Sequence, residues 1–238
     1  MASCKPDGYS LQKITAEQLP ILDTIAKIDS IDAMIFPYRS RIDAVLDSTL
    51  AYAPNTISKD DGSYNTTAGN LLADLVLERA NPIYKSRTSN TIDFVLLNHG
   101  GIRSTISKGP VSARTAYEVM PFENYIVVVE LPGTAVKSLL SFLIRSKRAH
   151  PVAGVQIVLN NDDTIHQVTI AGRLFSETET YHIATNDYLV KGGDNMGFFA
   201  DATAFHQTDY LVRNAIIDYF KAVDTIAPKV DDRFYKRN

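Results

Sequence analysis

The sequence predicts an α+β protein, a conclusion that rests on three kinds of segment. Residues 65–82 and 134–148 carry apolar side chains at helical spacing. Ile126 to Val129 form a β-branched run typical of a buried strand. Residues 154–172 place two strand-like segments around an Asn-Asn-Asp-Asp turn, which predicts an antiparallel hairpin. No Pro- or Ser-rich linker interrupts the series, so we expect helices and sheets to be layered in one compact unit.

The N-terminal residues have two interpretations. The start "MASCKPDGYS" puts small residues directly before Cys4 and a polar stretch after it, as at the end of a bacterial lipoprotein signal without its apolar part. Under that interpretation Cys4 is a lipidated anchor on the periplasmic side of the cell envelope. Otherwise Cys4 is an ordinary cysteine near the start of the chain. In either case we expect residues 1–28 to be an extended tether and residues 29–238 to be a single domain.

Composition narrows the class of partner. Hydrophobic residues make up 45% and charged residues 21% of the 238 residues, which is ordinary globular usage. A net charge of -3 argues against nucleic acid or an anionic membrane as the main partner. Cys4 is the one cysteine, so neither an intrachain disulfide nor a cysteine-based zinc site can form. We expect no membrane contact other than an anchor at Cys4, because no run of 18 apolar residues is present.

The first third of the chain predicts two helices and a strand. Apolar spacing predicts a helix from Asp29 to about Leu50, followed by Pro54. After a turn-rich loop, a second helix begins at Asn65, Thr66 or Thr67 and is expected to stop before Pro82. Residues 91–98 then form a short buried strand.

The remainder alternates between helices and strands. Residues 111–121 predict a short helix closed by proline, 124–133 a strand, 134–148 a helix and 154–172 the hairpin. Residues 181–194 predict a strand that enters a glycine loop. A final helix covers 210–223, and Pro228 with a charged tail is expected to end the fold.

Three segments at predicted strand ends are candidates for a binding site: Asn98–Arg103, Met120–Tyr125 and Ala184–Phe199. Ligands in layered α/β proteins commonly lie beyond strand ends. The pairs Gly100-Gly101 and Gly192-Gly193 would let the backbone approach a ligand, although each pair alone is also typical of an ordinary turn.

The side chains of these segments fit a nucleotide, and each also has an ordinary explanation. Arg103 offers paired donors for a phosphate or for sugar hydroxyls, or is a surface arginine. Phe122 beside Asn124 suits stacking on a base while its edge is read, or is a core phenylalanine. Tyr188 could cover the other face of the base, and Asp194 could accept hydrogen bonds from ribose hydroxyls.

Four motifs read together resemble one family. "NHGGIR", "ISKGPVSARTAYEVMPFEN", "VVVELPG" and "TNDYLVKGGD" are similar, in order and spacing, to the C-terminal, substrate-binding domain of periplasmic 5'-nucleotidases and related phosphoesterases. The resemblance runs from about Pro37 to Val223. It implies a four-layer α/β/β/α domain that holds the nucleoside part of the substrate. It also implies binding roles for Arg103, Phe122, Asn124, Tyr188 and Asp194. With Asn98 and the glycines of the two loops, the candidate binding residues are ten: Asn98, Gly100, Gly101, Arg103, Phe122, Asn124, Tyr188, Gly192, Gly193 and Asp194.

The chain departs from this family in two respects. Full-length members cleave phosphate with two metal ions held in an N-terminal metallophosphatase domain. Of its ligand motifs, Gly-Asn-His-Glu is resembled only superficially by "NHGG", in which glycines replace the acid. The five histidines are spread singly, so we expect no catalytic residue, no metal site and no cofactor in this chain. Two arginines that the family carries before its second helix are also missing, and that stretch offers only Lys59. Arg145, Lys147 and Arg148 could compensate, or could form a solvated helix end.

Three functional hypotheses follow. In the first, the chain is a substrate-binding subunit that holds a purine nucleotide such as AMP, in nucleotide catabolism, for a separate metallophosphatase chain whose divalent metals do the hydrolysis. In the second, it binds a nucleotide or nucleoside without an enzymatic partner. In the third, the fold is inherited and the pocket no longer binds, which leaves a structural or surface-interaction protein. The first two place the protein in the periplasm or cell envelope.

Overall fold

The computed structural model describes residues 11–22 and 24–237, and Cys4 with its suggested anchor lies outside them. The chain divides into two compact units, Met1–Ile42 and Asp43–Asn238. Residues 11–22 are exposed and form neither helix nor strand. Helix α1 (Asp29–Leu46) follows and has no buried side chain. The boundary expected after residue 28 stays a prediction. Of the described residues, no helix is both long and apolar enough to cross a bilayer.

The Asp43–Asn238 unit confirms the α+β class. Its central sheet has five strands in the order β10-β4-β9-β2-β5, a second sheet has the order β11-β6-β7-β8, and β1 pairs with β3. The strands are β1 Thr49–Ala53, β2 Phe94–Leu96, β3 Gly109–Ser112, β4 Tyr125–Pro132, β5 Val152–Ala153, β6 Val155–Leu159, β7 Ile165–Ile170, β8 Arg173–Leu174, β9 Thr180–Asn186, β10 Ala204–Leu211 and β11 Phe234–Lys236. The helices after α1 are α2 Thr67–Thr88, α3 Ala113–Val119, α4 Gly133–Ser146, α5 Asp187–Val190 and α6 Val212–Ala222, with short 3₁₀ turns η1 His99–Gly101, η2 Gly193–Asn195 and η3 Gly197–Asp201.

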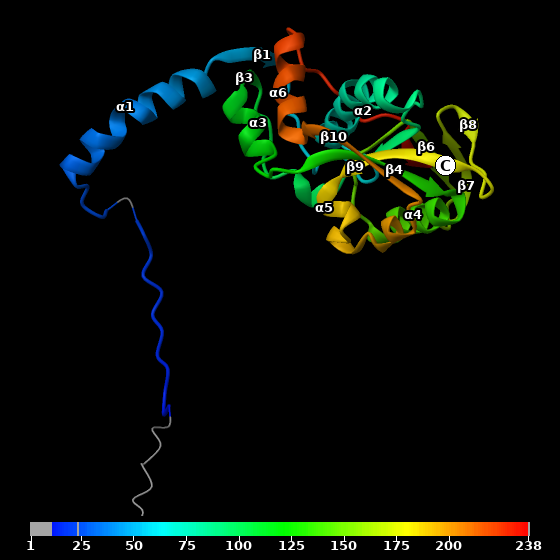
Figure 1. Ribbon diagram of the computed structural model, residues 1–238, viewed down its shortest axis with the longest axis horizontal. Helices are drawn as coiled ribbons and strands as arrows, with labels where there is room; N and C mark the ends of the chain where they lie inside the picture. Colours follow the sequence, from blue (N-terminus) through cyan, green and yellow to red (C-terminus); the bar gives the residue numbers. More distant parts are fainter. Residues whose placement is uncertain (1–10, 23, 238) are drawn as a thin grey trace, which may run out of the picture. The chain divides into compact units, whose positions relative to one another are not determined.

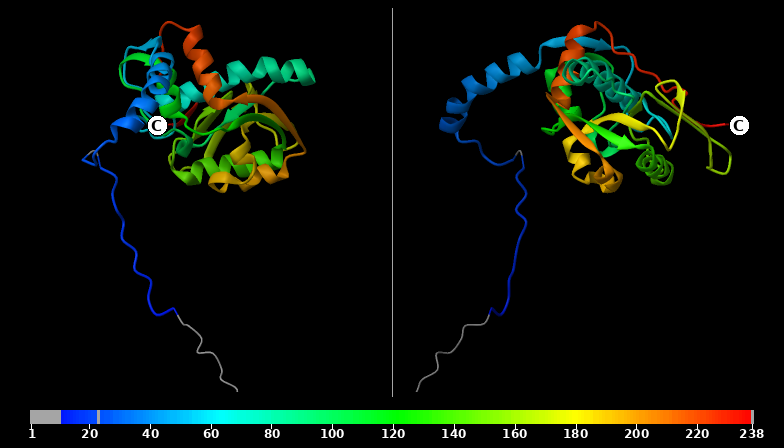
Figure 2. Two further views of the ribbon diagram at one scale, coloured as in Figure 1. Left: turned by 60° about the vertical axis from the view of Figure 1, so that its left-hand side comes forward. Right: turned by 45° about the vertical axis from the view of Figure 1, so that its right-hand side comes forward.

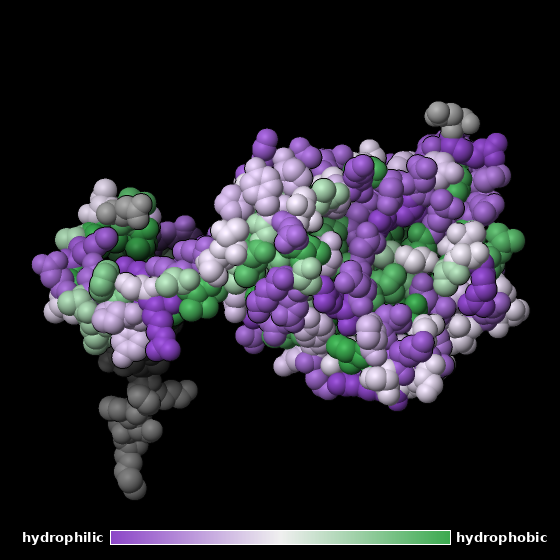
Figure 3. All heavy atoms as spheres, turned by 90° about the horizontal axis from the view of Figure 1, so that it is seen from above, coloured by the Kyte–Doolittle hydropathy of each residue, from purple (hydrophilic) through white to green (hydrophobic). Residues whose placement is uncertain are grey.

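Two apolar clusters lie on opposite faces of the central sheet. Val95 and Leu97 belong to a cluster with side chains of α2 and α6, whereas Phe94 and Leu96 belong to a second cluster with α4 and the four-stranded sheet. Successive residues of a strand point to opposite faces, so this division follows from the pleat. Figures 1 and 2 show α2 and α6 on one side of the sheet and α4 on the other. The face of this unit seen in Figure 3 is mostly hydrophilic, with small hydrophobic patches.

Several element boundaries differ from the prediction. The first helix ends at Leu46, and Leu50 lies in β1, where alternating burial replaces the helical stripe. Helix α2 begins as expected, with Thr66 accepting a hydrogen bond from Gly69 N–H, but it continues through Pro82 to Thr88. A proline removes only one helical N–H, and the turn that follows buries Tyr84.

Several strands were not predicted, among them β3 and β10. Strand β3 includes Val111 and Ser112, the first two residues of the helix predicted over 111–121. Strand β10 precedes α6, which begins at Val212 rather than 210. Strand β10 pairs antiparallel with β4 at the edge of the central sheet. Its half-exposed side chains gave only a weak pattern in the sequence.

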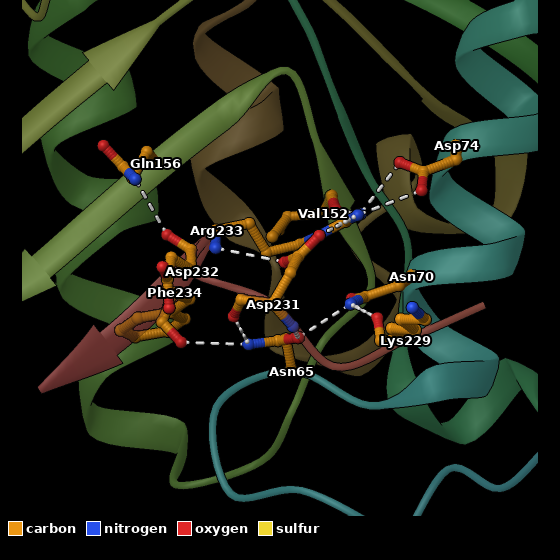
Figure 4. Close-up of polar contacts among 10 residues, drawn as sticks. All are labelled: Asn65, Asn70, Asp74, Val152, Gln156, Lys229, Asp231, Asp232, Arg233 and Phe234. Carbon is orange, nitrogen blue, oxygen red and sulfur yellow. Dashed lines mark hydrogen bonds and ion pairs between the residues drawn. The ribbon is translucent and has the colours of Figure 1, made fainter.

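The prediction that the charged tail ends the fold is wrong, because β11 pairs in parallel with β6. Figure 4 shows the contacts that hold this segment. Arg233 donates to both carboxylate oxygens of Asp74 at 2.8 and 3.0 Å, to Asp231, and to the Val152 carbonyl at 2.8 Å. The buried Asn65 amide donates to the carbonyls of Asp231 and Phe234. Cationic and amide donors thus fix the tail in place.

Candidate functional site

The three candidate segments meet at one end of the central sheet, beyond the C-terminal ends of β2 and β9. Strands β2 and β9 are parallel, so the residues after each lie at the same end. Strand β4 is antiparallel to β9 and pairs Ile126 with Asn186, which brings the segment before β4 to that end as well. The N–H of Tyr125 donates to Asp187 at 3.0 Å and links the two segments directly.

A cavity of about 260 Å³ opens where these segments meet. Its lining contains eight of the ten residues singled out in the sequence: Asn98, Gly100, Gly101, Arg103, Phe122, Asn124, Tyr188 and Asp194. Gly192 and Gly193 are not in this lining. The tertiary structure therefore brings together residues that are far apart in the chain, such as Asn98 and Asp194, which are 96 positions apart. Their part in binding a ligand stays a prediction.

The carboxylate of Asp194 organises one wall of the cavity. One oxygen accepts a hydrogen bond from the Asn98 amide at 2.7 Å, and the other accepts from the Tyr188 hydroxyl at 3.1 Å. Asp194 has φ of 51°, a left-handed conformation that aspartate adopts more readily than most residues. Each carboxylate oxygen has a second lone pair, so Asp194 can still accept from a ligand hydroxyl.

The glycine pair beside Asp194 has a steric reason. Gly192 has φ of +88°, which an L side chain rarely adopts. A Cβ on Gly193 would lie 2.4 Å from the ring of Tyr188. Neither glycine lines the cavity. The absence of a side chain at Gly193 leaves room for the Tyr188 ring, which does line it.

Phe122 and Arg103 contact each other in the lining of the cavity. The guanidinium carbon of Arg103 lies 5.9 Å from the centre of the Phe122 ring, within the range of a cation–π contact. Arg103 also donates to the Gly100 carbonyl at 3.2 Å. Phe122 is 41% exposed and Tyr188 45% exposed. Both rings are therefore open to a ligand, and neither is a core aromatic.

Arg213, which was not among the predicted site residues, positions the Phe122 segment. Its side chain is buried and donates to the carbonyls of Pro121 and Phe122 at 3.1 and 3.3 Å. It also lies 4.3 Å from the centre of the Tyr117 ring. An arginine on the apolar face of the predicted last helix was the available signal, because a buried cation needs specific partners.

The side chains of the described residues are not grouped as a metal centre requires. Among the described residues, no group of three or more His, Cys, Asp or Glu side chains is placed to hold a metal ion. His99 and His150 are joined through a backbone contact, since the His99 N–H donates to Nδ1 of His150 at 3.4 Å. We assign these residues no step of phosphoester hydrolysis.

Comparison with known proteins gives consistent matches. Residues 47–201 match the sequence family described as 5'-nucleotidase, C-terminal domain. The trifunctional nucleotide phosphoesterase protein YfkN of Bacillus subtilis is 27% identical over 191 residues, which are 71% of this chain and 12% of YfkN. Cell wall protein Lmo0130 of Listeria monocytogenes is 26% identical over 187 residues, 69% of this chain and 23% of Lmo0130.

A solved structure shares the fold. The 5'-nucleotidase precursor from Thermus thermophilus aligns with a TM-score of 0.72 at 21% identity, over 88% of this chain and 43% of that one. The chain spans less than half the length of each of these three proteins.

Proposed function

The chain belongs to the 5'-nucleotidase C-terminal domain family, the substrate-binding part of 5'-nucleotidases, and we propose that its cavity holds a purine nucleotide such as AMP. The observation that carries the proposal is the convergence of two open aromatic rings, an arginine, an amide and a carboxylate on one cavity. Its volume of about 260 Å³ is close to the lower end of the ~300–1,000 Å³ usual for small-molecule sites.

Each lining group has a task in this proposal. Phe122 and Tyr188 stack on the two faces of the base, and Asn124 reads its edge with an amide that can both donate and accept. Asp194 accepts hydrogen bonds from the ribose hydroxyls. Arg103 offers paired donors to the sugar hydroxyls or to a phosphate. The backbone of Gly100 and Gly101 allows the ligand to approach closely.

We propose that hydrolysis itself takes place at a divalent-metal centre on a separate metallophosphatase chain, to which this domain delivers the nucleotide. The donor set of the described residues supports that division, as does the family's pairing of this domain with a metallophosphatase domain. We place this activity in nucleotide catabolism at the periplasm or cell envelope, and the relative named as a cell wall protein supports that location. Lipidation of Cys4 belongs to the same proposal.

Calorimetry with AMP and adenosine tests the binding part through Phe122→Ala. Loss of one base–aromatic stack is worth roughly 1–3 kcal/mol, so Kd should rise by about 5- to 150-fold. Phe205→Ala is the matched control, because Phe205 is 46% exposed and lies on β10, outside the cavity lining. An unchanged Kd in folded Phe122→Ala would remove the ring from the site.

An activity assay tests the partner. AMP hydrolysis should require a metallophosphatase chain added to this one, and should depend on a divalent metal. Strong metal-dependent hydrolysis by this chain alone would overturn the division of labour. Binding without any such partner would leave the chain as a free-standing nucleotide-binding protein.

A further inference from the structure

A second cavity adjoins the first and shares two residues with it. It has a volume of about 260 Å³ and is lined by Gly100, Phe142, Ser146, Arg148, His150, Asp194 and Asn195. Gly100 and Asp194 line both cavities. If the ribose of a bound nucleotide contacts Asp194, a phosphate on that ribose would therefore lie at the border of this second cavity. This step rests on the proposed function.

Arg148 gives the second cavity a cation. Helix α4 ends at Ser146, and the left-handed Lys147, with φ of 49°, turns the chain away from the helix axis. The N–H of His150 donates to the Arg148 carbonyl at 2.9 Å and fixes that turn. Arg148 forms no ion pair with any carboxylate of the described residues. Its planar fork of donors is free for a phosphate.

His150 adds a neutral donor beside it. The side chain is 6% exposed, and burial, with a smaller contribution from His99, lowers its pKa to about 4. The imidazole is therefore uncharged at neutral pH. Its Nδ1 accepts from the His99 N–H at 3.4 Å, and the tautomer that suits this contact carries its proton on Nε2, from which it can donate to a ligand. The charge of Asp194 opposes an anion here, but its two oxygens already accept from Asn98 and Tyr188.

The other basic residues near the site are differently engaged. Lys59 Nζ donates to the Ile102 carbonyl at 2.9 Å and braces the loop before Arg103. Lys147 and Arg148 both line a separate cavity that includes Tyr64 and Phe234, and of the two only Arg148 also lines the cavity beside Asp194. Arg145 lines neither of the two adjoining cavities.

We propose that Arg148 and His150 form a phosphate-binding subsite beside the nucleoside cavity, reached past Gly100 and Asp194. The phosphate is carried by the bound nucleotide, on either the 5' or the 3' position of its ribose. In this arrangement Arg148 supplies the charge, and the neutral His150 supplies a directed hydrogen bond without adding to the local charge. Arg148 thus takes up the role of a cation that Lys59, Arg145 and Lys147 do not fill.

The test compares adenosine, 5'-AMP and 3'-AMP by calorimetry, with wild type, Arg148→Gln and Lys147→Gln. The wild type should bind at least one nucleotide more tightly than adenosine. Arg148→Gln should reduce this preference roughly ten- to a hundred-fold, because it removes hydrogen bonds between charged groups, which contribute strongly to the free energy of binding. Adenosine affinity should stay the same in Arg148→Gln, and Lys147→Gln, which removes an equal charge one residue away, should behave as wild type. The isomer that responds identifies which phosphate the subsite holds.

Two results would overturn the subsite while leaving the proposed function intact. One is that wild type and Arg148→Gln prefer nucleotides over adenosine to the same degree, which includes the case in which neither shows a preference. The other is an equal loss for adenosine and nucleotides, which would make Arg148 a positioning residue. If the wild type binds none of the three ligands, the proposed function itself fails and the subsite fails with it.

Discussion

The contact between Gly193 and Tyr188 allows a test of the cavity wall with a single methyl group. A Cβ at Gly193 would lie 2.4, 2.5 and 2.7 Å from three atoms of the Tyr188 ring. Carbon atoms in contact are normally about 3.5–4.0 Å apart, so Gly193→Ala should push the ring away by roughly 1 Å. Gly193 is absent from the positive-φ glycines, so the substitution brings no backbone strain of that kind. The effect should be purely steric.

The displaced ring should weaken binding more than folding. Moving Tyr188 breaks its 3.1 Å hydrogen bond to Asp194 and removes one face of the proposed base stack. The loss of a stack is worth roughly 1–3 kcal/mol, so Kd for AMP should rise by about 5- to 150-fold. Tyr188 is 45% exposed, so the free energy of unfolding should change little.

Calorimetry with AMP and urea denaturation together measure both effects. Gly197→Ala is the matched control, because a Cβ at Gly197 has no heavy atom within 4 Å. It should bind AMP as the wild type does. A Gly193→Ala protein that binds AMP within about twofold of wild type would show that Tyr188 does not contact the ligand in the way we argue.

Two further predictions concern stability. Arg233→Met should lower the free energy of unfolding by roughly 2–3 kcal/mol, since hydrogen bonds to charged groups are lost around a side chain that is 14% exposed; urea denaturation measures this. The pH dependence should carry a contribution from His150, whose folded pKa of about 4 lies below the ordinary 6.5. Protonation therefore favours the unfolded chain. The free energy of unfolding should fall by up to ~3 kcal/mol as the pH drops from about 6.5 to about 4, and this contribution should level off below that.

Each stability prediction has a control. Arg87→Met removes a surface pair with Asp209, whose side chains are 47% and 69% exposed, and should cost less than about 1 kcal/mol. An equal loss in the two arginine variants would contradict the role given to Arg233. His150→Asn keeps an acceptor near the position of Nδ1 but does not titrate. If this variant shows the same slope between about pH 6.5 and 4 as the wild type, burial of His150 is not the cause.

The family and the class of fold could be predicted from the sequence alone, because both depend on local patterns. The β-branched run of β4, the hairpin of β6 and β7, and the cap of α2 are each encoded within a few residues. The motifs that carry the family resemblance are equally short. Pro82 shows the limit of such reasoning, since a local rule stopped a helix that tertiary packing continues.

The tertiary structure determined which strands pair and which distant residues share a cavity, because both depend on long-range contacts. Strands β10 and β11 carry little pattern of their own and exist because β4 and β6 offer edges to pair with. The sequence alone identified Asn98, Phe122 and Tyr188 as candidate binding residues. Only the parallel pairing of β2 with β9, and the antiparallel pairing of β4 with β9, brings them to one cavity. The second cavity likewise depends on tertiary contacts, because it brings Arg148, after the end of α4, together with Gly100 and Asp194. These residues are far apart in the chain, so no local sequence pattern predicts that they share a cavity.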